Sequence, residues 1–550
     1  MSRDSDVLVV GAGPTGLAAA CTLLREGVPV RVVDRRRGPT ALPKALIVWS
    51  GALEVLDRLG VADALAERAL RLRGASYWSR GRAVASVGFG ALAGSRFPGP
   101  LCVPQPVTEE LLYERLLQLG GRVEWGTEAA DVTVEGDAVR VGLRTAPGGA
   151  HPPGTPAAPQ TARARWLVAA DGAHSTVRTS LGIPFEGGTY ARDFLLGDGV
   201  VKVEGPAAVP VDEAQYHLTP DGVLVVVALP EGGHRVFFDQ PAGSGEAAPA
   251  LPELQALLDA RGPGGWTLAD TTWTSRFRVH TRVAARFRQG PVLLAGDAAH
   301  CHSPAGGQGL NTGVQDAYDL GWKLTAVLGG ADESLLDSYE AERRPAAVRA
   351  VSRADAQTRL WLLRSPLARL ARDTALRALS ASGLLEKRLV PELAQVDPDL
   401  TGSPAVGGPA GDGIVPGRRI PDAPLSALHG RQADTLHGYL AAGRHTVVVL
   451  GTSAYDEAAV RAARRACAHD TTGRLDVLLI RPGALPGAGA LPAHDTADGR
   501  LGTTSQAVYV RPDGVVGARL PLGGTADVND LLARVPVLKG AVNHRVPPTR

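Results

Sequence analysis

The sequence predicts an α/β protein of more than one domain, in which a doubly wound parallel sheet is joined by a mainly β domain and a second α/β unit. Its 550 residues are too many for one hydrophobic core. The chain opens with an apolar strand, a glycine-rich turn, a helix and a second strand, which together begin a parallel sheet. A new alternation, in the order strand, helix, strand, hairpin and helix, follows the Pro/Gly-rich stretch at 402–413.

The composition argues against several classes of function. A net charge of +2 gives no reason to expect nucleic acid or an anionic membrane as partner. The four cysteines are far apart and lack ligand spacing, so neither a disulfide framework nor a metal site is expected. The first residues pass straight into a strand without a signal-peptide pattern, and no apolar run has the length of a membrane span. We therefore expect a cytoplasmic protein without a metal.

The first motif is a glycine-rich turn between the strand at 6–10 and the following helix. It reads Gly11-x-Gly13-x-x-Gly16, and such glycines let the backbone approach a pyrophosphate that lies at the helix N-terminus. Asp34 ends the second strand, 18 residues after Gly16, where its carboxylate can bind both hydroxyls of an adenosine ribose. The motif predicts a dinucleotide without separating NAD from FAD. The expected contacts are Gly11, Gly13, Thr15, Gly16, Asp34 and Arg35.

Two further segments end an apolar strand at an aspartate or glycine. In "RWLVAADGAHSTVR" the strand ends at Asp171-Gly172, and Arg178 lies on the short helix that follows. These three residues are expected at the cofactor, although a purely structural helix start is an alternative. Residues 222–239 between the two segments predict an antiparallel hairpin with a Glu-Gly-Gly turn.

The second of these segments, residues 296–324, predicts the site of a flavin. Asp297 follows "PVLLAG", at the carboxyl end of a strand, where open α/β sheets bind ligands. Its carboxylate suits the hydroxyls of a ribityl chain, and the glycines after Pro304 let a flat ring approach the backbone. A helix from about Leu310 points its N-terminal amides at the ring, where they stabilise the negative charge of reduced flavin. The expected contacts are Gly296, Asp297, Pro304, Gly307, Gly309, Leu310 and Asn311.

These three motifs, in this order, resemble the single-component FAD-dependent aromatic hydroxylases, which include the 4-hydroxybenzoate, phenol and aromatic polyketide hydroxylases. The resemblance covers residues 5–345 closely and the rest more loosely. It implies FAD as cofactor and NADPH or NADH as hydride donor, with NADPH expected. It also implies that a C4a-hydroperoxyflavin inserts one oxygen atom of O2 into an aromatic substrate. By the same resemblance, Gln105 contacts FAD, whereas Lys44 stands where relatives usually have an arginine near the cofactor.

The expected domains follow from the motifs and the resemblance. The FAD-binding domain with its trailing helices comprises 1–180 and 276–400, and a mainly β substrate domain comprises 181–275, with residues near 75–105 as a candidate addition. A linker at 401–413 leads to 414–550, which resembles the thioredoxin-like C-terminal domain of the phenol hydroxylase branch. That domain has Cys467 but no CxxC, so packing or dimerisation is its expected role. The chain is expected to be a monomer or homodimer.

The substrate is less well determined than the cofactor. Within the family that the chain resembles, its composition and C-terminal domain favour a polycyclic aromatic polyketide, as in antibiotic biosynthesis. A simple phenol, Baeyer–Villiger oxygenation of a quinone or ketone, and an FAD-containing protein that only binds an aromatic compound are the alternatives.

Several residues are candidates for the substrate side. Trp78, Tyr216 and Trp273 fall in the expected substrate segments, although such residues more often pack in a core or on a sheet face. His302 and Pro304 are placed next to the reacting ring, where His302 can help a substrate hydroxyl to ionise. His300 is expected to pack under the turn as a hydrogen-bonded histidine.

Overall fold

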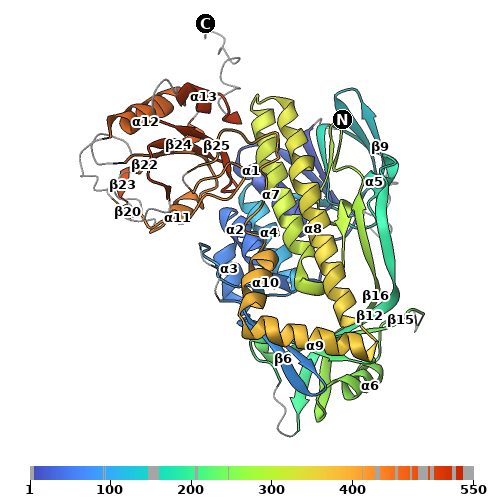
Figure 1. Ribbon diagram of the computed structural model, residues 1–550. Coiled ribbons are helices and arrows are strands. Elements are labelled where there is room, and N and C mark those ends of the chain that lie inside the picture. Colours follow the sequence, from blue (N-terminus) through green and yellow to red (C-terminus); the bar gives the residue numbers. More distant parts are fainter. Residues whose placement is uncertain are drawn as a thin grey trace.

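The computed structural model consists of three main sheets with helices packed against them (Figure 1). It describes residues 5–90, 92, 94–146, 160–204, 209–243, 245, 247–411, 413–427, 434–452, 456–470, 473–480, 493–495, 501–522 and 528–536. Among these residues, no helix combines the length and the apolar character needed to cross a membrane.

The first sheet contains the predicted strand–helix–strand unit. Its parallel strands lie in the order β18, β11, β1, β2, β8. Strand β17 pairs antiparallel with the edge strand β18, whereas β10 pairs antiparallel with the inner strand β11 and with β9. The bounds are β1 (Ser5–Val10), β2 (Val30–Asp34), β8 (Val123–Trp125), β9 (Thr127–Glu135), β10 (Ala138–Thr145), β11 (Gln160–Ala169), β17 (Arg288–Gln289) and β18 (Val292–Leu294). Helices α1 (Pro14–Arg25), α4 (Gln105–Gln118) and α7 (Gly309–Leu328) pack together beside it.

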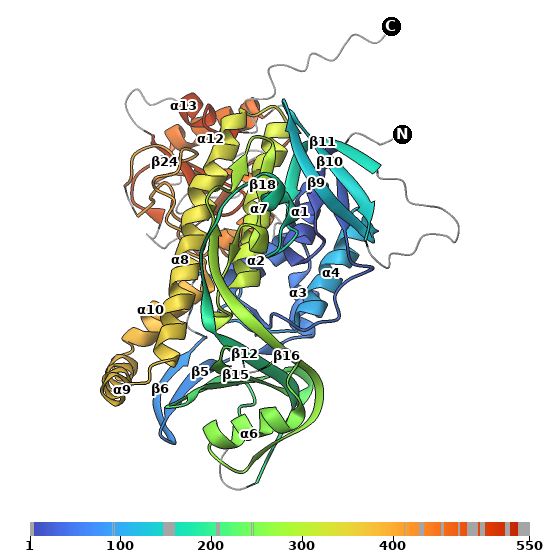
Figure 2. The same ribbon diagram turned by 90° about the vertical axis from the view of Figure 1, so that its right-hand side faces the viewer.

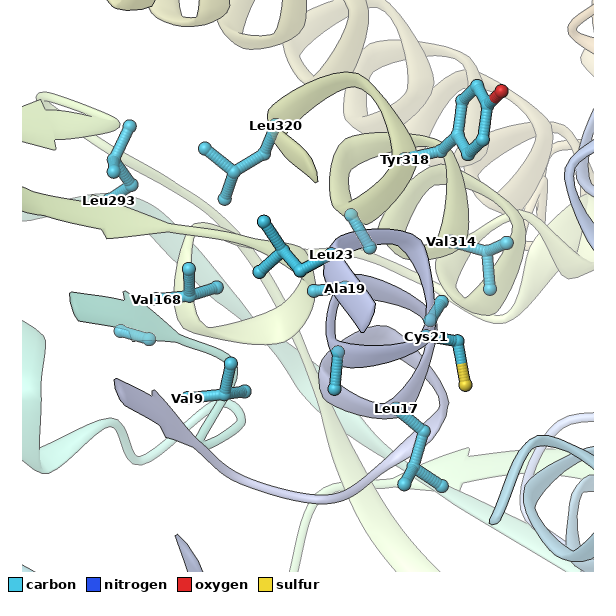
Figure 3. Packing of buried hydrophobic residues seen from close by; sticks show 14 of the residues in the cluster. Val9, Leu17, Ala19, Cys21, Leu23, Val168, Leu293, Val314, Tyr318 and Leu320 are labelled. Carbon is cyan, nitrogen blue, oxygen red and sulfur yellow. The ribbon is translucent and has the colours of Figure 1, made fainter. Parts of the chain in front are cut away.

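Helix α1 lies between the first sheet and α7 (Figure 3). Its small and branched residues, among them Leu17, Ala19 and Leu23, are fully buried against strand residues such as Val168 and against Val314 of α7. Because Ala19 is small, the helix can pack closely on both sides. The apolar core therefore fixes the N-terminus of α1 relative to that of α7.

The second sheet is built from distant parts of the chain. Its order is β19-β16-β12-β15-β14-β13-β5-β6, and β14 and β15 form the predicted antiparallel hairpin. Strands β12 and β16 are 19 residues each and extend from the region of the first sheet into the second sheet (Figure 2). The bounds are β5 (Gly74–Ser79), β6 (Arg82–Gly88), β12 (Phe185–Val203), β13 (Glu213–Thr219), β14 (Gly222–Ala228), β15 (His234–Pro241), β16 (Trp266–Ala284) and β19 (His300–Cys301).

Helices cover both faces of the second sheet. Helix α6 (Leu251–Arg261) packs on one face, and residues of α8 (Asp337–Trp361) and α10 (Leu384–Ala394) pack on the other. Helix α9 (Pro366–Ala381) contacts β6. The shorter elements are α2 (Ser50–Arg58), α3 (Ala62–Glu67), α5 (Thr176–Ser180) and a small sheet of β3 (Ile47–Val48), β4 (Leu70–Arg71) and β7 (Leu101–Cys102).

The C-terminal unit has the predicted order of strand, helix, strand, hairpin and helix. Parallel β21 and β22 lie at the centre of a sheet that continues antiparallel through β24 and β25. The bounds are β20 (Ser426–Ala427), α11 (Leu436–Leu440), β21 (His445–Leu450), α12 (Glu457–His469), β22 (Leu475–Ile480), β23 (Ala493–Asp495), β24 (Gln506–Val510), β25 (Val516–Pro521) and α13 (Val528–Leu532). The unit lies beside α7 and α8 (Figure 1).

A buried histidine in the second sheet predicts a pH-dependent stability. Burial lowers the pKa of His217 to about 4, whereas an unfolded histidine titrates near 6.5. The unfolded chain therefore binds more protons below pH 6.5, and the free energy of unfolding should fall by up to about 1.4 kcal/mol per pH unit between pH 6 and 5 on this account. His217→Phe should flatten this slope while keeping the ring stacked on Trp78. Urea midpoints at pH 7, 6 and 5 measure it, with the exposed His469→Phe as control; an equal slope in both variants would contradict the prediction.

Candidate active site

The first glycine turn leaves open space at its middle residue. Gly11 has φ +102, and a Cβ there would lie 2.2 Å from the carbonyl oxygen of Ala170. A Cβ on Gly16 would lie 1.9 Å from the carbonyl oxygen of Gly11. A Cβ on Gly13, by contrast, would meet no described atom within 4 Å. Gly13 is the N-cap of α1 and provides no side-chain cap, so the turn has the room and the amide donors that a pyrophosphate needs.

Asp34 ends β2 with a carboxylate that already has protein donors. Its Oδ2 accepts from the Ala12 amide at 2.7 Å and its Oδ1 from the Arg36 amide at 2.7 Å. The Arg36 guanidinium also pairs with Asp34 and, at 2.6 Å, with the buried Glu109. The expected Arg35 is exposed, so Arg36 is the arginine that the sequence did not single out. A ribose at Asp34 would have to share the carboxylate with Arg36.

The start of α1, the Gly296 loop and α7 meet at Thr15. A Cβ on Gly296 or on Gly313 would lie 2.5 Å from Thr15 Oγ1. These close approaches place Asp297 next to the first glycine turn. Burial among protein atoms raises the pKa of Asp297, while His300 and Lys44 lower it. The Asp297 side chain is nevertheless exposed, as expected for a carboxylate that faces a ligand.

Asp316 of α7 holds the Gly296 loop from below. Its Oδ2 accepts from the Gly296 amide at 3.1 Å and from His300 Nε2 at 2.7 Å, and its Oδ1 accepts from Arg343 Nε at 2.7 Å. Although burial alone raises the pKa of Asp316, Arg343 and His300 together hold it below its ordinary value. His300 is fully buried and hydrogen-bonded, as predicted. Asp316 lies within the segment 296–324 that predicts the flavin site, but its spacing does not reveal this role.

Asn311 joins the start of α7 to the segment before α2. Its Oδ1 accepts from the Trp49 amide at 2.6 Å, and its Nδ2 donates to the carbonyls of Ile47 at 2.8 Å and Gly307 at 2.6 Å. Trp49 Nε1 donates to the carbonyl of Gly306 at 2.8 Å. The Asn311 side chain therefore supports the loop. Because its polar atoms are already hydrogen-bonded, only the backbone of Asn311 is left to contact a cofactor.

The glycine loop before α7 needs its glycines for backbone conformation. Gly306 and Gly307 have φ +75 and +63, the left-handed region. A Cβ on Gly307 would also lie 2.9 Å from the Ile47 Cβ. Pro304 is exposed, and its carbonyl accepts from the Gly307 amide at 2.9 Å. The half-exposed Gly309 and Leu310 begin α7 directly after this loop.

The loop at 39–46 is held from both sides. Gln105 Oε1 accepts from the Ala45 amide at 3.3 Å. From the second sheet, Arg235 Nη1 donates to the carbonyl of Lys44 at 2.7 Å, and its Nη2 contacts that of Pro43. Arg235 also forms a buried two-pronged pair with Asp198 at 2.6 and 2.7 Å. The exposed Lys44 is thereby positioned near Asp297. Arg235 is an arginine in an apolar strand, and no local sequence pattern predicts this role for it.

Arg178 connects the Asp171 turn to the Gly296 loop. Its Nη1 donates to the carbonyl of Ala298 at 2.8 Å, and its Nη2 to that of Ala173 at 2.9 Å. Asp171 Oδ2 accepts from the Val177 amide at 3.2 Å, and burial raises the pKa of Asp171. The adjacent Gly172 has φ +85. Arg178 therefore braces the two motifs through backbone carbonyls.

An aromatic face of the second sheet packs with the cofactor loops. Tyr216 stacks on Tyr77 at 4.9 Å between ring centroids, and Trp361 of α8 lies 5.4 Å from Tyr216. Trp273 lies under the Arg235 guanidinium at 5.1 Å. The same apolar cluster includes loop residues on the cofactor side, namely Leu46, Trp49 and Ala305. Two of the three expected substrate residues, Tyr216 and Trp273, are thus brought to this face.

Trp78 lies on the other face of the sheet. Because successive strand residues alternate, Trp78 points away from the face that carries its neighbour Tyr77. Its ring stacks on His217, and its Nε1 donates to Ser76 Oγ at 3.0 Å. The structure therefore separates Trp78 from Tyr216 and Trp273 by the thickness of the sheet.

His302 presents a neutral imidazole near the start of α7. Its Nδ1 donates to the Ser303 carbonyl at 2.8 Å, and its buried Nε2 has no hydrogen-bond partner among the described residues. A Cβ on Gly309 would lie 3.8 Å from this ring. Burial lowers the pKa of His302 to about 4, so at neutral pH Nε2 is a free hydrogen-bond acceptor.

The chain is similar to known FAD-binding proteins. A family model described as an FAD binding domain matches residues 4–354. The 12-dehydrotetracycline 5-monooxygenase/anhydrotetracycline 6-monooxygenase of Streptomyces rimosus is 34% identical over 544 residues, 96% of this chain and 98% of that protein. The 6-methylpretetramide 4-monooxygenase of Streptomyces rimosus is 38% identical over 390 residues, 70% of this chain and 67% of that protein.

The match extends to solved structures. That of an anhydrotetracycline hydroxylase from Streptomyces rimosus has a TM-score of 0.73 at 29% identity, with all of both chains covered. The family match spans more than half of this chain, and one relative matches nearly all of it. The chain therefore belongs to the family of this FAD-binding domain, and it is an FAD-dependent monooxygenase.

Proposed function

We propose that this monooxygenase uses NADPH or NADH and O2 to oxygenate a polycyclic aromatic polyketide. The observation that carries the proposal is the aromatic face, which shares one apolar cluster with the loops at Trp49 and Ala305. Stacked rings favour a flat aromatic substrate over an aliphatic one. The two Streptomyces relatives are named for pretetramide and tetracycline compounds, which are four-ringed polyketides with aromatic rings. We also propose that the enzyme is cytoplasmic and a monomer or homodimer.

The two loops around the α1 and α7 N-termini would hold FAD. The amides after Gly13 fit its pyrophosphate, Asp34 its ribose and the exposed Asp297 its ribityl chain. The Gly306-Gly307 backbone and the N-terminus of α7 fit its ring. Bound FAD supplies the redox chemistry, taking a hydride from NAD(P)H and activating O2. The remaining proposed contacts are Gly11, Thr15, Gly16, Lys44, Gln105, Asp171, Gly172, Arg178, Gly296, Pro304, Gly309, Leu310 and Asn311.

The protein's own task is to orient the substrate and to exclude water. The aromatic compound would bind beside Tyr216, Phe237 and Trp361, whose rings pack on one another. All three belong to or pack against the apolar cluster, which offers water few hydrogen-bonding groups. Excluding water protects the reactive intermediates of the oxygenation from unproductive decay.

His302→Ala is expected to keep FAD and to lose coupling between NAD(P)H use and product. The free Nε2 of His302 would accept the hydrogen bond of a substrate hydroxyl, and losing such a group costs about 100-fold in product formation. Product per NAD(P)H consumed, measured by chromatography, is the readout. His302→Gln, which retains an acceptor, should recover part of the coupling. Unchanged coupling in the alanine variant would show that His302 has no role in the reaction.

The proposed function is tested by anaerobic reduction of the purified protein with NADPH and then NADH. Each is tried with and without a panel of simple phenols, anthraquinones and tetracyclic aromatics. Acceleration by the polycyclic compounds, followed in air by a product heavier by one oxygen, is the expected result. If only phenols accelerate flavin reduction, the substrate is a simple phenol and not a polyketide. A ring-expanded lactone product would establish Baeyer–Villiger oxygenation, and no reduction under any condition would leave an aromatic-binding flavoprotein.

A further inference from the structure

A buried charged cluster joins the C-terminal unit to α7 and α8. Arg511 follows β24 and is 1% exposed. Its two Nη atoms donate to the two carboxylate oxygens of Glu342 at 2.8 Å each, and Nη2 also donates to Asp319 at 3.2 Å. The guanidinium lies 5.0 Å from the ring of Trp322. One side chain of the C-terminal unit therefore contacts both helices that border the cofactor site.

The cluster contains more negative than positive charge. Lys323 donates to Asp319 at 2.8 Å and to Glu342 at 2.7 Å, and Asp513 pairs with Arg511 as well. Three carboxylates thus share two cations in a buried place. If Arg511 is removed, Lys323 alone is left to neutralise Asp319 and Glu342, and buried carboxylates without enough counter-charge repel each other strongly. The packing of α7 on α8 has to change in response.

The same two helices carry the residues that hold the cofactor loop. Glu342 is followed directly by Arg343, which donates to Asp316. Asp316 lies one turn before Asp319 on α7 and accepts from the Gly296 amide. Arg343 also donates from Nη2 to the Thr312 carbonyl at 3.2 Å. A shift of α8 at Glu342 is therefore also a shift at Arg343, one residue away.

We propose that Arg511 is a positioning residue for the FAD loop at Gly296-Asp297. It acts through Glu342 and Asp319, which fix α7 and α8 so that Asp316 meets the Gly296 amide. The C-terminal unit thereby takes part in FAD retention through a residue that lies outside the proposed flavin site. This role concerns the cofactor and is independent of which aromatic substrate the enzyme oxidises.

The test compares two arginines of the C-terminal unit that both pair with the rest of the chain. Arg511→Met removes the cluster contact, whereas Arg419→Met removes a pair with Glu54 on α2 (2.7 Å). Apoprotein of each full-length variant is titrated with FAD, and flavin fluorescence gives the dissociation constant. The visible circular dichroism of the bound flavin and the thermal midpoint are recorded alongside.

For Arg511→Met the FAD dissociation constant should rise at least tenfold and the flavin dichroism should change. Arg419→Met should stay within twofold of the parent for FAD, whatever its thermal midpoint. A purely structural role would lower the thermal midpoint of Arg511→Met without moving either flavin readout, and that result would overturn the proposal. If Arg511→Met fails to fold, Arg511→Lys replaces it, because lysine keeps the charge but lacks the two-pronged contact. Its FAD dissociation constant should rise about threefold, and parental affinity would likewise overturn the proposal.

Discussion

Gly13→Val is expected to weaken FAD binding by about 100-fold while leaving the fold intact. Gly13 has φ −73 and extended ψ, which valine adopts without strain, and a Cβ there meets no described atom within 4 Å. That free space is where the pyrophosphate would approach the amides of α1. Losing charge-assisted hydrogen bonds of about 1.5–3 kcal/mol raises the dissociation constant by about 100-fold.

Two measurements separate binding from folding in this variant. The thermal midpoint of apoprotein should match the parent, and titration with FAD should show the loss of affinity. Gly16→Val is the contrasting control, because its Cβ would lie 1.9 Å from the Gly11 carbonyl oxygen and the apoprotein itself should unfold more easily. A Gly13→Val protein that stays yellow with parental affinity would place the pyrophosphate elsewhere.

Arg235→Met is expected to destabilise the protein by about 3–5 kcal/mol, the usual cost of leaving one partner of a buried pair without its counter-charge. Asp198 is 5% exposed and receives both prongs of Arg235. The carbonyls of Pro43 and Lys44 lose their donor as well, so the loop that carries Lys44 is released. Urea unfolding of the apoprotein measures the stability, and FAD titration measures the effect on the loop.

The control for Arg235 lies on the adjacent part of the same sheet. Arg276 pairs with Glu253, whose side chain is 33% exposed, so water can solvate that carboxylate after Arg276→Met. The expected cost there is about 1 kcal/mol or less. The double variant Arg235→Met/Asp198→Leu should recover much of the stability but not the hold on the loop. Equal costs for the two single variants would show that burial of Asp198 is not the cause.

The sequence was informative wherever structure depends on neighbouring residues. Glycine spacing predicted the turn at Gly11, and apolar runs predicted the β14–β15 hairpin and the order of the C-terminal unit. The sequence also indicated, through its glycine and aspartate motifs, a set of candidate cofactor residues. It could not tell that the side chain of Asn311 donates to the carbonyl of Ile47, or that of Arg178 to the carbonyl of Ala298, because these partners are 264 and 120 positions away.

The residues that were missed act across long sequence separations. Arg235 and Lys44 are 191 positions apart, and Arg511 and Glu342 are 169 apart. No periodicity links such positions; only the folded arrangement of the sheets and helices brings them together. Trp78 was misplaced for a related reason. A strand predicted from composition does not reveal which of its two faces looks toward the cofactor until its pairing with β13 is known.

The long strands β12 and β16 limit how the enzyme can open, and their pairing shifts register only between Thr189 and Asp193 and between Asp198 and Val200. They pair from Phe185 opposite Ala284 to Val203 opposite Trp266, and β16 continues the ladder to Cys301. A hinge between the first and the second sheet would have to break this shared ladder. We therefore expect the two sheets to move as one rigid body, without opening and closing on each other. Aromatic compounds must then enter and leave by movement of loops and side chains around a frame that stays still. Turnover in this enzyme should depend on the loop at 39–46 and the end of α8 rather than on domain closure.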